Sequence, residues 1–374
     1  MARGALEAGV GFCTSYPGTP ATEIAEYIMA RAQSLGIHAE WSVNEKVALE
    51  AAWGASWAGI PSLCSMKSLG LNVASDSLLS MNLSETGDGG FVIIVGDDPR
   101  GHSTSTEQDS RFYAKAALLP LLEPSGYQEA KDVVPYAFDI SRRFKVPVII
   151  RSTTRLGHSR GLVNPGPITS YDSPKPLKMK ENLFNVPDVH LARRDLKIKN
   201  QKISEEFDLS PFNMLHVKKD SNLITIASGI CQRYAEEAVE SLGIKNAGAL
   251  GLVTTHPIPE KVVGKAISST PNALFLEETD PFVEDLVRGF STEMPSVRCK
   301  FHGKRNNTVP SHGEMNTNLA VLAIQKTLGM ELMRIDEKEA KIRESARALL
   351  IRRALTFCAG CTHRNVYWAV RKAK

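Results

Sequence analysis

Short apolar runs alternate with amphipathic stretches over the first 160 residues of the chain. The runs at 91–95 (FVIIV) and 146–152 (VPVIIRS) are continuous and β-branched, which is typical of strands buried on both faces. Between such runs, apolar residues recur at helical spacing over 21–35 and 44–58. This alternation predicts a mainly parallel sheet covered by helices, and therefore a doubly wound α/β domain.

The pattern fades and then resumes. Clustered prolines and lysine-rich segments over 162–218 predict a connector wrapped over a surface. The segments NLITIASG, CQRYAEEAVESLG, AGALGLVTT and NALFLEET then predict a second, smaller α/β domain. The predicted organisation is a first domain at 1–161, a connector at 162–218, a second domain at 219–330, and a tail at 331–374 that begins with a charged helix.

Charge and composition exclude several classes of partner. The 45 basic and 41 acidic residues give a net charge of +4 and are spread along the chain, so no basic stripe indicates nucleic acid or a membrane surface. Neither a signal peptide nor an apolar run of about 18 residues occurs. We therefore expect a cytoplasmic protein, in which the isolated Cys13, Cys64, Cys231 and Cys299 are reduced core residues.

The segment EWSVNEKVALEAAWGASWAG is the first with possible chemistry. A strand ends near Val43 and a helix follows, which places Glu45 in the first helical turn at the carboxyl end of a strand. Ligands of open α/β sheets collect at that edge. However, Ser42-x-x-Glu45 also matches a capping box, in which the carboxylate only accepts a backbone N–H. On spacing alone, the cap is the favoured interpretation.

The turn YPGTP at 16–20 is a second candidate. Gly18 permits close backbone approach, Thr19 is expected at the helix N-cap and Pro20 at the first helical position. A loop that opens a helix can hold an anion or the polar edge of a cofactor. An ordinary capped turn explains the same residues and is favoured in isolation.

Residues 96–111 (GDDPRGHSTSTEQDSR) form a polar loop after the strand at 91–95 and include His102. A functional loop and a solvated connection explain them equally well, and their spacing does not indicate a metal site. The nearby GDG at 87–89 is similar to the start of the magnesium site of thiamine enzymes. No asparagine occurs between Asn82 and Asn164 to complete that site, so a turn is favoured.

Cys358 and Cys361 form a CxxC pair followed by His363. Such a pair can belong to an iron–sulfur or zinc site or act as a redox pair, but two ligands do not close a site. A thiol–disulfide function is disfavoured, because the pair does not lie between the strand and helix of a thioredoxin-like unit.

In chain order, YPGTPATEI, EWSVNEKVALEAAWGAS, MKSLGLNVASDSL, GDDPRGHSTSTEQDSRFYAK, LEETDPFVED and CAGCTHR resemble the alpha subunit of indolepyruvate ferredoxin oxidoreductases. The resemblance covers nearly the whole chain. It implies a pyrimidine-binding domain, then a transketolase C-terminal-like domain, then the beginning of a diphosphate-binding domain. The chain is thus expected to be truncated at both ends.

The resemblance implies oxidative decarboxylation of aryl 2-oxo acids such as indolepyruvate to acyl-CoA, with electrons passed to ferredoxin. Glu45 then becomes catalytic, because its carboxyl contacts the aminopyrimidine ring of thiamine diphosphate and favours the tautomer that removes the thiazolium proton. By the same resemblance, Thr19 is expected to face cofactor and substrate, and Asn72 and His102 are expected to line the same cleft. Cys358 and Cys361 are implied to be the first ligands of an iron–sulfur cluster.

The resemblance also implies partners. Mg²⁺ and the cofactor's diphosphate are expected outside this chain, on a diphosphate-binding domain from a further chain or from the missing C-terminus. Two protein partners are expected: a beta subunit that carries the gamma-type domain, and ferredoxin. Coenzyme A is expected as a co-substrate. The alternative is a non-catalytic truncated remnant or an assembly partner of such an enzyme, which the missing third domain motivates.

Overall fold

The structure of the chain is a computed structural model. It describes residues 1–171, 188–294, 298–332, 337–351 and 363–373. These residues divide into two units, 1–330 and 331–374, which are described separately.

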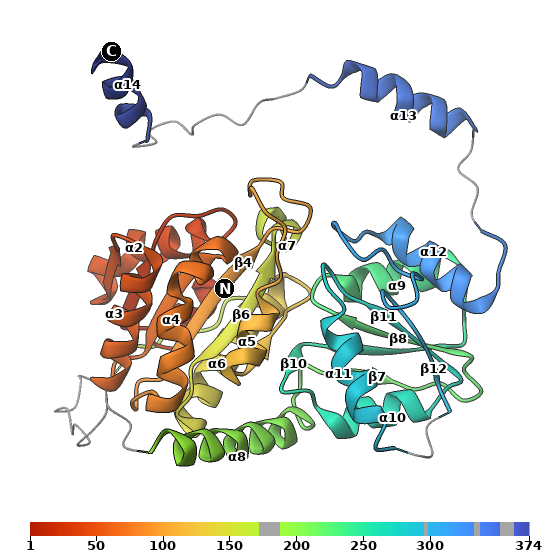
Figure 1. Cartoon of the computed structure of the whole chain (residues 1–374), viewed down its shortest axis with the longest axis horizontal. Coiled ribbons are helices and arrows are strands. Elements are labelled where there is room, and N and C mark those ends of the chain that lie inside the picture. Colours follow the sequence, from red (N-terminus) through yellow and green to blue (C-terminus); the bar gives the residue numbers. More distant parts are fainter. Residues whose placement is uncertain (172–187, 295–297, 333–336, 352–362, 374) are drawn as a thin grey trace. The chain divides into compact units, whose positions relative to one another are not determined.

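A seven-stranded sheet forms one half of the larger unit (Figure 1). Its order is β10-β5-β6-β4-β3-β1-β2, and all neighbouring strands are parallel except β10 and β5. Every residue of β4 is buried, which explains the unbroken apolar run in the sequence. The strands are β1 (Phe12–Ser15), β2 (His38–Trp41), β3 (Ser62–Lys67), β4 (Phe91–Asp97), β5 (Leu121–Leu122), β6 (Val148–Thr153) and β10 (Thr254–His256).

Two layers of helices cover this sheet, as the sequence pattern predicts. Helix α1 contacts α2 and α6 in one layer, and α4 contacts α3 and α5 in the other. The helices are α1 (Ala2–Glu7), α2 (Thr22–Leu35), α3 (Glu45–Trp57), α4 (Ser68–Ser84), α5 (Arg111–Ala117), α6 (Tyr127–Phe144) and the short α7 (Thr154–His158). The doubly wound α/β class predicted for this half is confirmed.

The second half contains a five-stranded sheet of order β12-β11-β8-β9-β7, in which only β7 is antiparallel. Its strands are β7 (Met214–His216), β8 (Leu223–Ser228), β9 (Ala247–Leu252), β11 (Asn272–Leu276) and β12 (Lys300–His302). Its helices are α9 (Cys231–Ser241), α10 (Glu260–Ser268), α11 (Phe282–Ser291) and α12 (Thr317–Leu328). The α/β class predicted for this half is therefore confirmed, whereas its separation as a second domain remains a prediction, since both sheets belong to one compact unit.

The predicted connector is more regular than expected. Within 162–218 lies a 19-residue helix, α8 (Val189–Phe207), which the sequence analysis did not predict. Only a narrow stripe of it is buried, including Leu196, Ile203 and Phe207, and it contacts α4, α6 and α10. Most of this helix is exposed and rich in charged residues. Few apolar residues therefore recur at helical spacing, and the helical pattern is weak in the sequence. Strand β10 follows β9 of the second sheet along the chain but pairs with β5 of the first sheet. The two halves therefore share a strand, and the proposed domain boundaries remain a prediction.

The GDG at 87–89 lies in a turn before β4, as predicted, with the Gly90 N–H donating to the Gly87 carbonyl. Glycine is required for packing. A Cβ at Gly87 would lie 2.2 Å from the Ser56 carbonyl oxygen, and one at Gly89 would lie 2.2 Å from that of Ile60. The motif therefore serves close packing against the end of α3.

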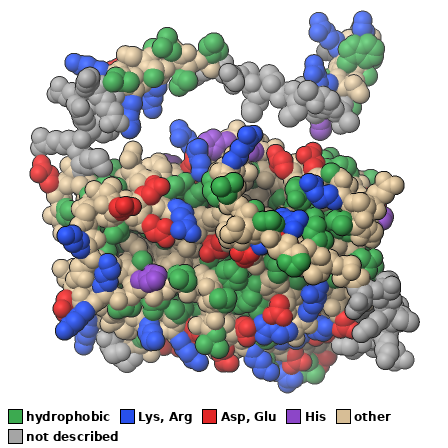
Figure 2. Space-filling view, turned by 180° about the vertical axis from the view of Figure 1, so that it is seen from behind, with side chains coloured by type: hydrophobic (Ala, Val, Ile, Leu, Met, Phe, Trp, Pro, Cys, Tyr) green, Lys and Arg blue, Asp and Glu red, His purple; other side chains and the backbone are tan. Residues whose placement is uncertain are grey.

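The smaller unit contains α13 (Glu337–Leu349), within the predicted charged helix, and α14 (His363–Ala373). Cys358 and Cys361 lie outside the described residues. No described helix is long and apolar enough to cross a membrane. Figure 2 shows basic and acidic side chains interspersed over one face of the molecule, in keeping with the balanced charge.

Candidate active site

Four parallel strands bring the candidate residues to one edge of the first sheet, which we call the carboxyl edge. Strands β1 to β4 are neighbours in the order β4-β3-β1-β2, so their carboxyl ends lie together. Thr19 follows β1, Glu45 follows β2, Lys67 ends β3 and Asp98 follows β4. This is the edge at which open α/β sheets bind ligands.

Glu45 is the first residue of α3 and is half-buried. Its side chain lies against Gly70 of α4: a Cβ at Gly70 would lie 2.4 Å from Glu45 Cγ and 2.5 Å from its Oε1. Among the residues that the structure describes, none hydrogen-bonds to this carboxylate or forms an ion pair with it. The Glu45 carboxyl group thus lies at the carboxyl edge without a partner among the described residues.

The capping box predicted for Ser42 and Glu45 is wrong. The N-cap of α3 is Asn44, whose Oδ1 accepts the Val47 N–H at 2.9 Å. The Ser42 N–H still donates to the Ser15 carbonyl along the sheet, so the helix begins two residues later. The Ser42 Oγ is buried without a hydrogen-bond partner in the described chain. Glu45 is therefore not needed as a cap.

Asn44→Ala is expected to lower the free energy of unfolding by about 1 kcal/mol, because the Val47 N–H loses its acceptor. Ser42→Ala is expected to change it by less than about 0.5 kcal/mol, since its hydroxyl makes no hydrogen bond. Urea denaturation of both variants against the unmodified chain measures the two values. A greater loss for Ser42→Ala would return the capping role to Ser42.

The turn at 16–20 also differs from its prediction. Helix α2 begins at Thr22 rather than after Thr19, because the Ala21 N–H donates to the Gly18 carbonyl and closes a separate turn first. The Thr22 hydroxyl accepts the Gly18 N–H at 2.8 Å. Thr19 is therefore not the N-cap. Its half-buried hydroxyl makes no hydrogen bond to the described residues, so it too is available at the carboxyl edge.

Asn72 lies two residues beyond Gly70 on α4, but its amide is engaged. It exchanges two hydrogen bonds with the Gln108 amide, at 2.9 and 3.0 Å, and accepts one from the Tyr113 hydroxyl at 2.7 Å. Gln108 also donates to the Ser68 carbonyl. Asn72 thus ties α4 to the polar loop and to α5. Its predicted contact with cofactor remains a prediction.

The polar loop is neither wholly solvated nor wholly buried. Asp98 anchors it by accepting from Thr104, Thr154 and the backbone N–H groups of His102 and Ser103. Burial alone would raise the pKa of Asp98, but these hydrogen bonds outweigh it and lower that pKa to about 2. His102 is exposed and lies 3.1 Å from Glu314 of the second half. That contact crosses between the two halves.

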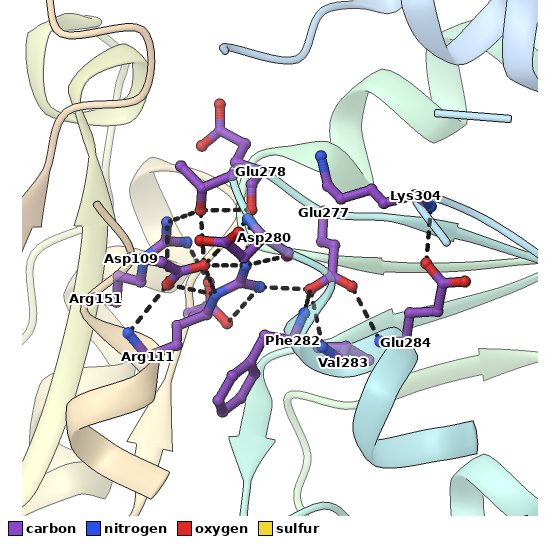
Figure 3. Close-up of polar contacts among 12 residues, drawn as sticks. Asp109, Arg111, Arg151, Glu277, Glu278, Asp280, Phe282, Val283, Glu284 and Lys304 are labelled. Atoms are coloured by element: carbon purple, nitrogen blue, oxygen red, sulfur yellow. Dashed lines mark hydrogen bonds and ion pairs between the residues drawn. The ribbon is translucent and has the colours of Figure 1, made fainter. Parts of the chain in front are cut away.

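The two ends of this loop enter a buried ion network that the sequence analysis missed (Figure 3). Arg111 is fully buried and pairs with Asp109 at 2.5 Å and Glu277 at 2.6 Å. Arg151 pairs with Asp97 at 2.6 Å and Glu123 at 2.7 Å. Because Glu277 follows β11, the network joins the two sheets.

Backbone groups complete the network. Arg111 also donates to the carbonyls of Glu278 and Asp280, and Glu277 accepts three backbone N–H groups at the start of α11. Burial, partly offset by Arg151, raises the pKa of Glu278 to about 7. The sequence carried two signals for this network: the charged residues of the polar loop at 96–111, and an arginine in the mainly apolar strand VPVIIRS.

The described residues contain no group of three or more His, Cys, Asp and Glu that could hold a metal ion. Cys13, Cys64 and Cys231 are buried free thiols, and burial raises the pKa of each. The partly buried Cys299 has a pKa raised to about 11 by burial. Cys13, Cys64 and Cys231 match the predicted role as core residues, whereas Cys299 is only partly buried against the core.

Residues 3–193 match the family model described as "Pyruvate flavodoxin/ferredoxin oxidoreductase, thiamine diP-bdg". The chain belongs to this family. Two curated relatives named indolepyruvate oxidoreductase subunit IorA match over the whole chain, at 40% identity in Thermococcus kodakarensis and 36% in Archaeoglobus fulgidus. The chain spans 58% and 59% of those two proteins.

Solved structures show that the fold of this family member is shared more widely. A 2-oxoglutarate:ferredoxin oxidoreductase from Magnetococcus marinus superposes with a TM-score of 0.66 at 17% identity, over 87% of this chain and 64% of that one. A split-gene transketolase gives 0.55 at 12% identity, over 89% and 98%. Both likenesses concern the fold, and they agree with the predicted α/β architecture.

Proposed function

We propose that this chain is the alpha subunit, or a part of it, of a thiamine-diphosphate-dependent 2-oxo acid:ferredoxin oxidoreductase that acts on aryl 2-oxo acids such as indolepyruvate. The observation that carries the proposal is the Glu45 carboxylate, which lies at the carboxyl edge without a hydrogen bond or ion pair among the described residues. The names of the relatives that match the whole chain support the aryl substrate.

The residues at the carboxyl edge fit the aminopyrimidine ring of that cofactor. Glu45 offers an unpaired carboxylate, Thr19 an unpaired hydroxyl, and Ser42 a buried hydroxyl without a partner among the described groups. These are donors and acceptors suited to a nitrogen heterocycle with an exocyclic amine. When bound, thiamine diphosphate supplies a carbanion nucleophile that attacks the 2-oxo group.

Each residue has a proposed task. Glu45 hydrogen-bonds through its carboxyl to a ring nitrogen and holds a proton there, and Gly70 leaves room for its side chain. Thr19 faces the reacting carbonyl, and Asn72 and His102 shape the wall of the cleft. Mg²⁺ and the diphosphate are proposed to be held outside this chain, and Cys358 and Cys361 to ligate an iron–sulfur cluster.

Anaerobic turnover by an assembled complex tests this proposal. The chain would be co-produced with a diphosphate-binding region and the beta subunit, and reduction of a viologen dye followed with indolepyruvate, phenylpyruvate, pyruvate and 2-oxoglutarate. We expect reduction that requires both thiamine diphosphate and coenzyme A and is fastest with the aryl substrates. Preference for 2-oxoglutarate or pyruvate would contradict the aryl assignment, and no reduction with any 2-oxo acid would contradict the activity.

A further inference from the structure

Lys67 occupies the centre of the carboxyl edge. It is the last residue of β3 and the N-cap of α4, three residues before the glycine that contacts Glu45. On its other side it lies under the turn at 16–20, because a Cβ at Gly18 would be 2.9 Å from Lys67 Cβ. A cationic side chain therefore starts between the Thr19 turn and the Glu45 contact.

Among the described residues, no carboxylate forms an ion pair with the Lys67 ammonium. Its one hydrogen bond in the described chain goes to a neutral acceptor, the Ser103 carbonyl, at 2.8 Å. By contrast, Lys131 and Lys145 each lie 2.7 Å from a carboxylate. An ammonium carries three donors, so Lys67 has capacity left over.

The Asp98 carboxylate does not serve as a contacting counter-ion for Lys67 among the described residues. Asp98 acts on Lys67 only through space and is itself held by Thr104, Thr154 and loop N–H groups. Burial lowers the pKa of Lys67 and Asp98 opposes this shift. A half-buried cation without a contacting counter-ion favours binding of an anionic group from outside.

We propose that the Lys67 ammonium receives the carboxylate of the 2-oxo acid and so acts as a substrate-binding residue that orients the 2-oxo carbon. The inference rests on the proposed function, because it assumes that a 2-oxo acid enters the cleft beside Glu45 and Thr19. The carboxylate is bonded directly to the 2-oxo carbon. When the Lys67 ammonium holds the carboxylate, the 2-oxo carbon therefore faces the residues at 16–20. The contact is present in the bound substrate and ends when the carboxylate departs as carbon dioxide, leaving its bonding electron pair on the substrate carbon.

This role predicts that loss of the Lys67 charge changes KM more than kcat. In Lys67→Met, the apolar stem remains and the charge is lost, so KM for the aryl 2-oxo acid is expected to rise about 10- to 100-fold, with a smaller change in kcat. Lys67→Arg retains a cation and is expected to recover most of the affinity. Lys145→Met, which removes an equally long cation paired with Asp88 far from this edge, serves as the control.

Two inhibitors separate charge recognition from a structural role. In the assembled complex, the inhibition constant of 3-indolepropanoate is expected to rise as much as KM in Lys67→Met, whereas that of its neutral amide stays unchanged. Equal weakening of both inhibitors would overturn the inference, as would an unchanged KM in a complex whose unmodified form turns over. Absence of 2-oxo acid turnover in the unmodified complex would instead refute the proposed function, and this inference with it.

Discussion

Glu45→Gln is expected to lower aryl 2-oxo acid oxidation by the assembled complex by about 10²- to 10⁴-fold, the range typical of losing a general acid or base. The amide fills the same space against Gly70 but cannot hold an acidic proton for the cofactor's ring nitrogen. Because no described residue hydrogen-bonds to the Glu45 carboxylate, the melting temperature is expected to change little. Viologen reduction and thermal unfolding, measured on the same preparations, check both expectations.

Glu23→Gln is the matched control for that variant. Glu23 lies in the first turn of α2, as Glu45 does in α3, but it is exposed to solvent. The substitution therefore removes the same charge from a helix start, but at a position where the side chain faces solvent. Full activity in Glu45→Gln, or an equal loss in Glu23→Gln, would show that Glu45 has no special chemical role.

Arg111→Met is expected to lower the free energy of unfolding by about 3–5 kcal/mol, which is typical when one member of a buried ion network is removed. Asp109 and Glu277 would remain buried without the cation that now contacts both. The Arg111 guanidinium also lowers the pKa of Asp109 against the opposing effect of burial, so that carboxyl would take up a proton more readily in the variant. Urea denaturation at neutral pH measures the loss.

Arg143→Met provides the comparison for Arg111. Arg143 also contacts two carboxylates, those of Asp139 and Glu206, but its side chain is 42% exposed. Its loss is expected to cost less than about 1 kcal/mol, because solvent screens the pairs. If the two variants were equally stable, burial would not be what makes the Arg111 network strong.

The elements that carry the fold were predictable because their signals are local. The run FVIIV became β4, buried along its whole length, and CQRYAEEAVESLG became α9. The start of α3 was placed within one residue of its position. Its cap was misassigned, since the choice between Ser42 and Asn44 depends on where strand pairing to Ser15 ends. That information is not in the local pattern.

The site was only partly predictable. Glu45 and Thr19 were reached through motifs, and the structure adds that both lie at one edge and lack partners among the described residues. Lys67 lies in the motif MKSLGLNVASDSL, but nothing in the sequence marks it as a site residue. Its lack of a contacting counter-ion among the described residues is visible only in the folded chain. Arg111 and Glu277 are 166 residues apart, and no periodicity links them.

The β10 strand has a consequence for how the chain is made. Residues 254–256 close the open side of β5, whose Leu121 and Leu122 were synthesised about 130 residues earlier. Until β10 has been translated, β5 is an unpaired edge strand of the first sheet. The ion pair between Arg111 and Glu277 cannot form until Glu277 has been translated. The first sheet is therefore completed only after the chain as far as β10 has emerged, and a chaperone that covers this edge during synthesis would protect the nascent chain from aggregation.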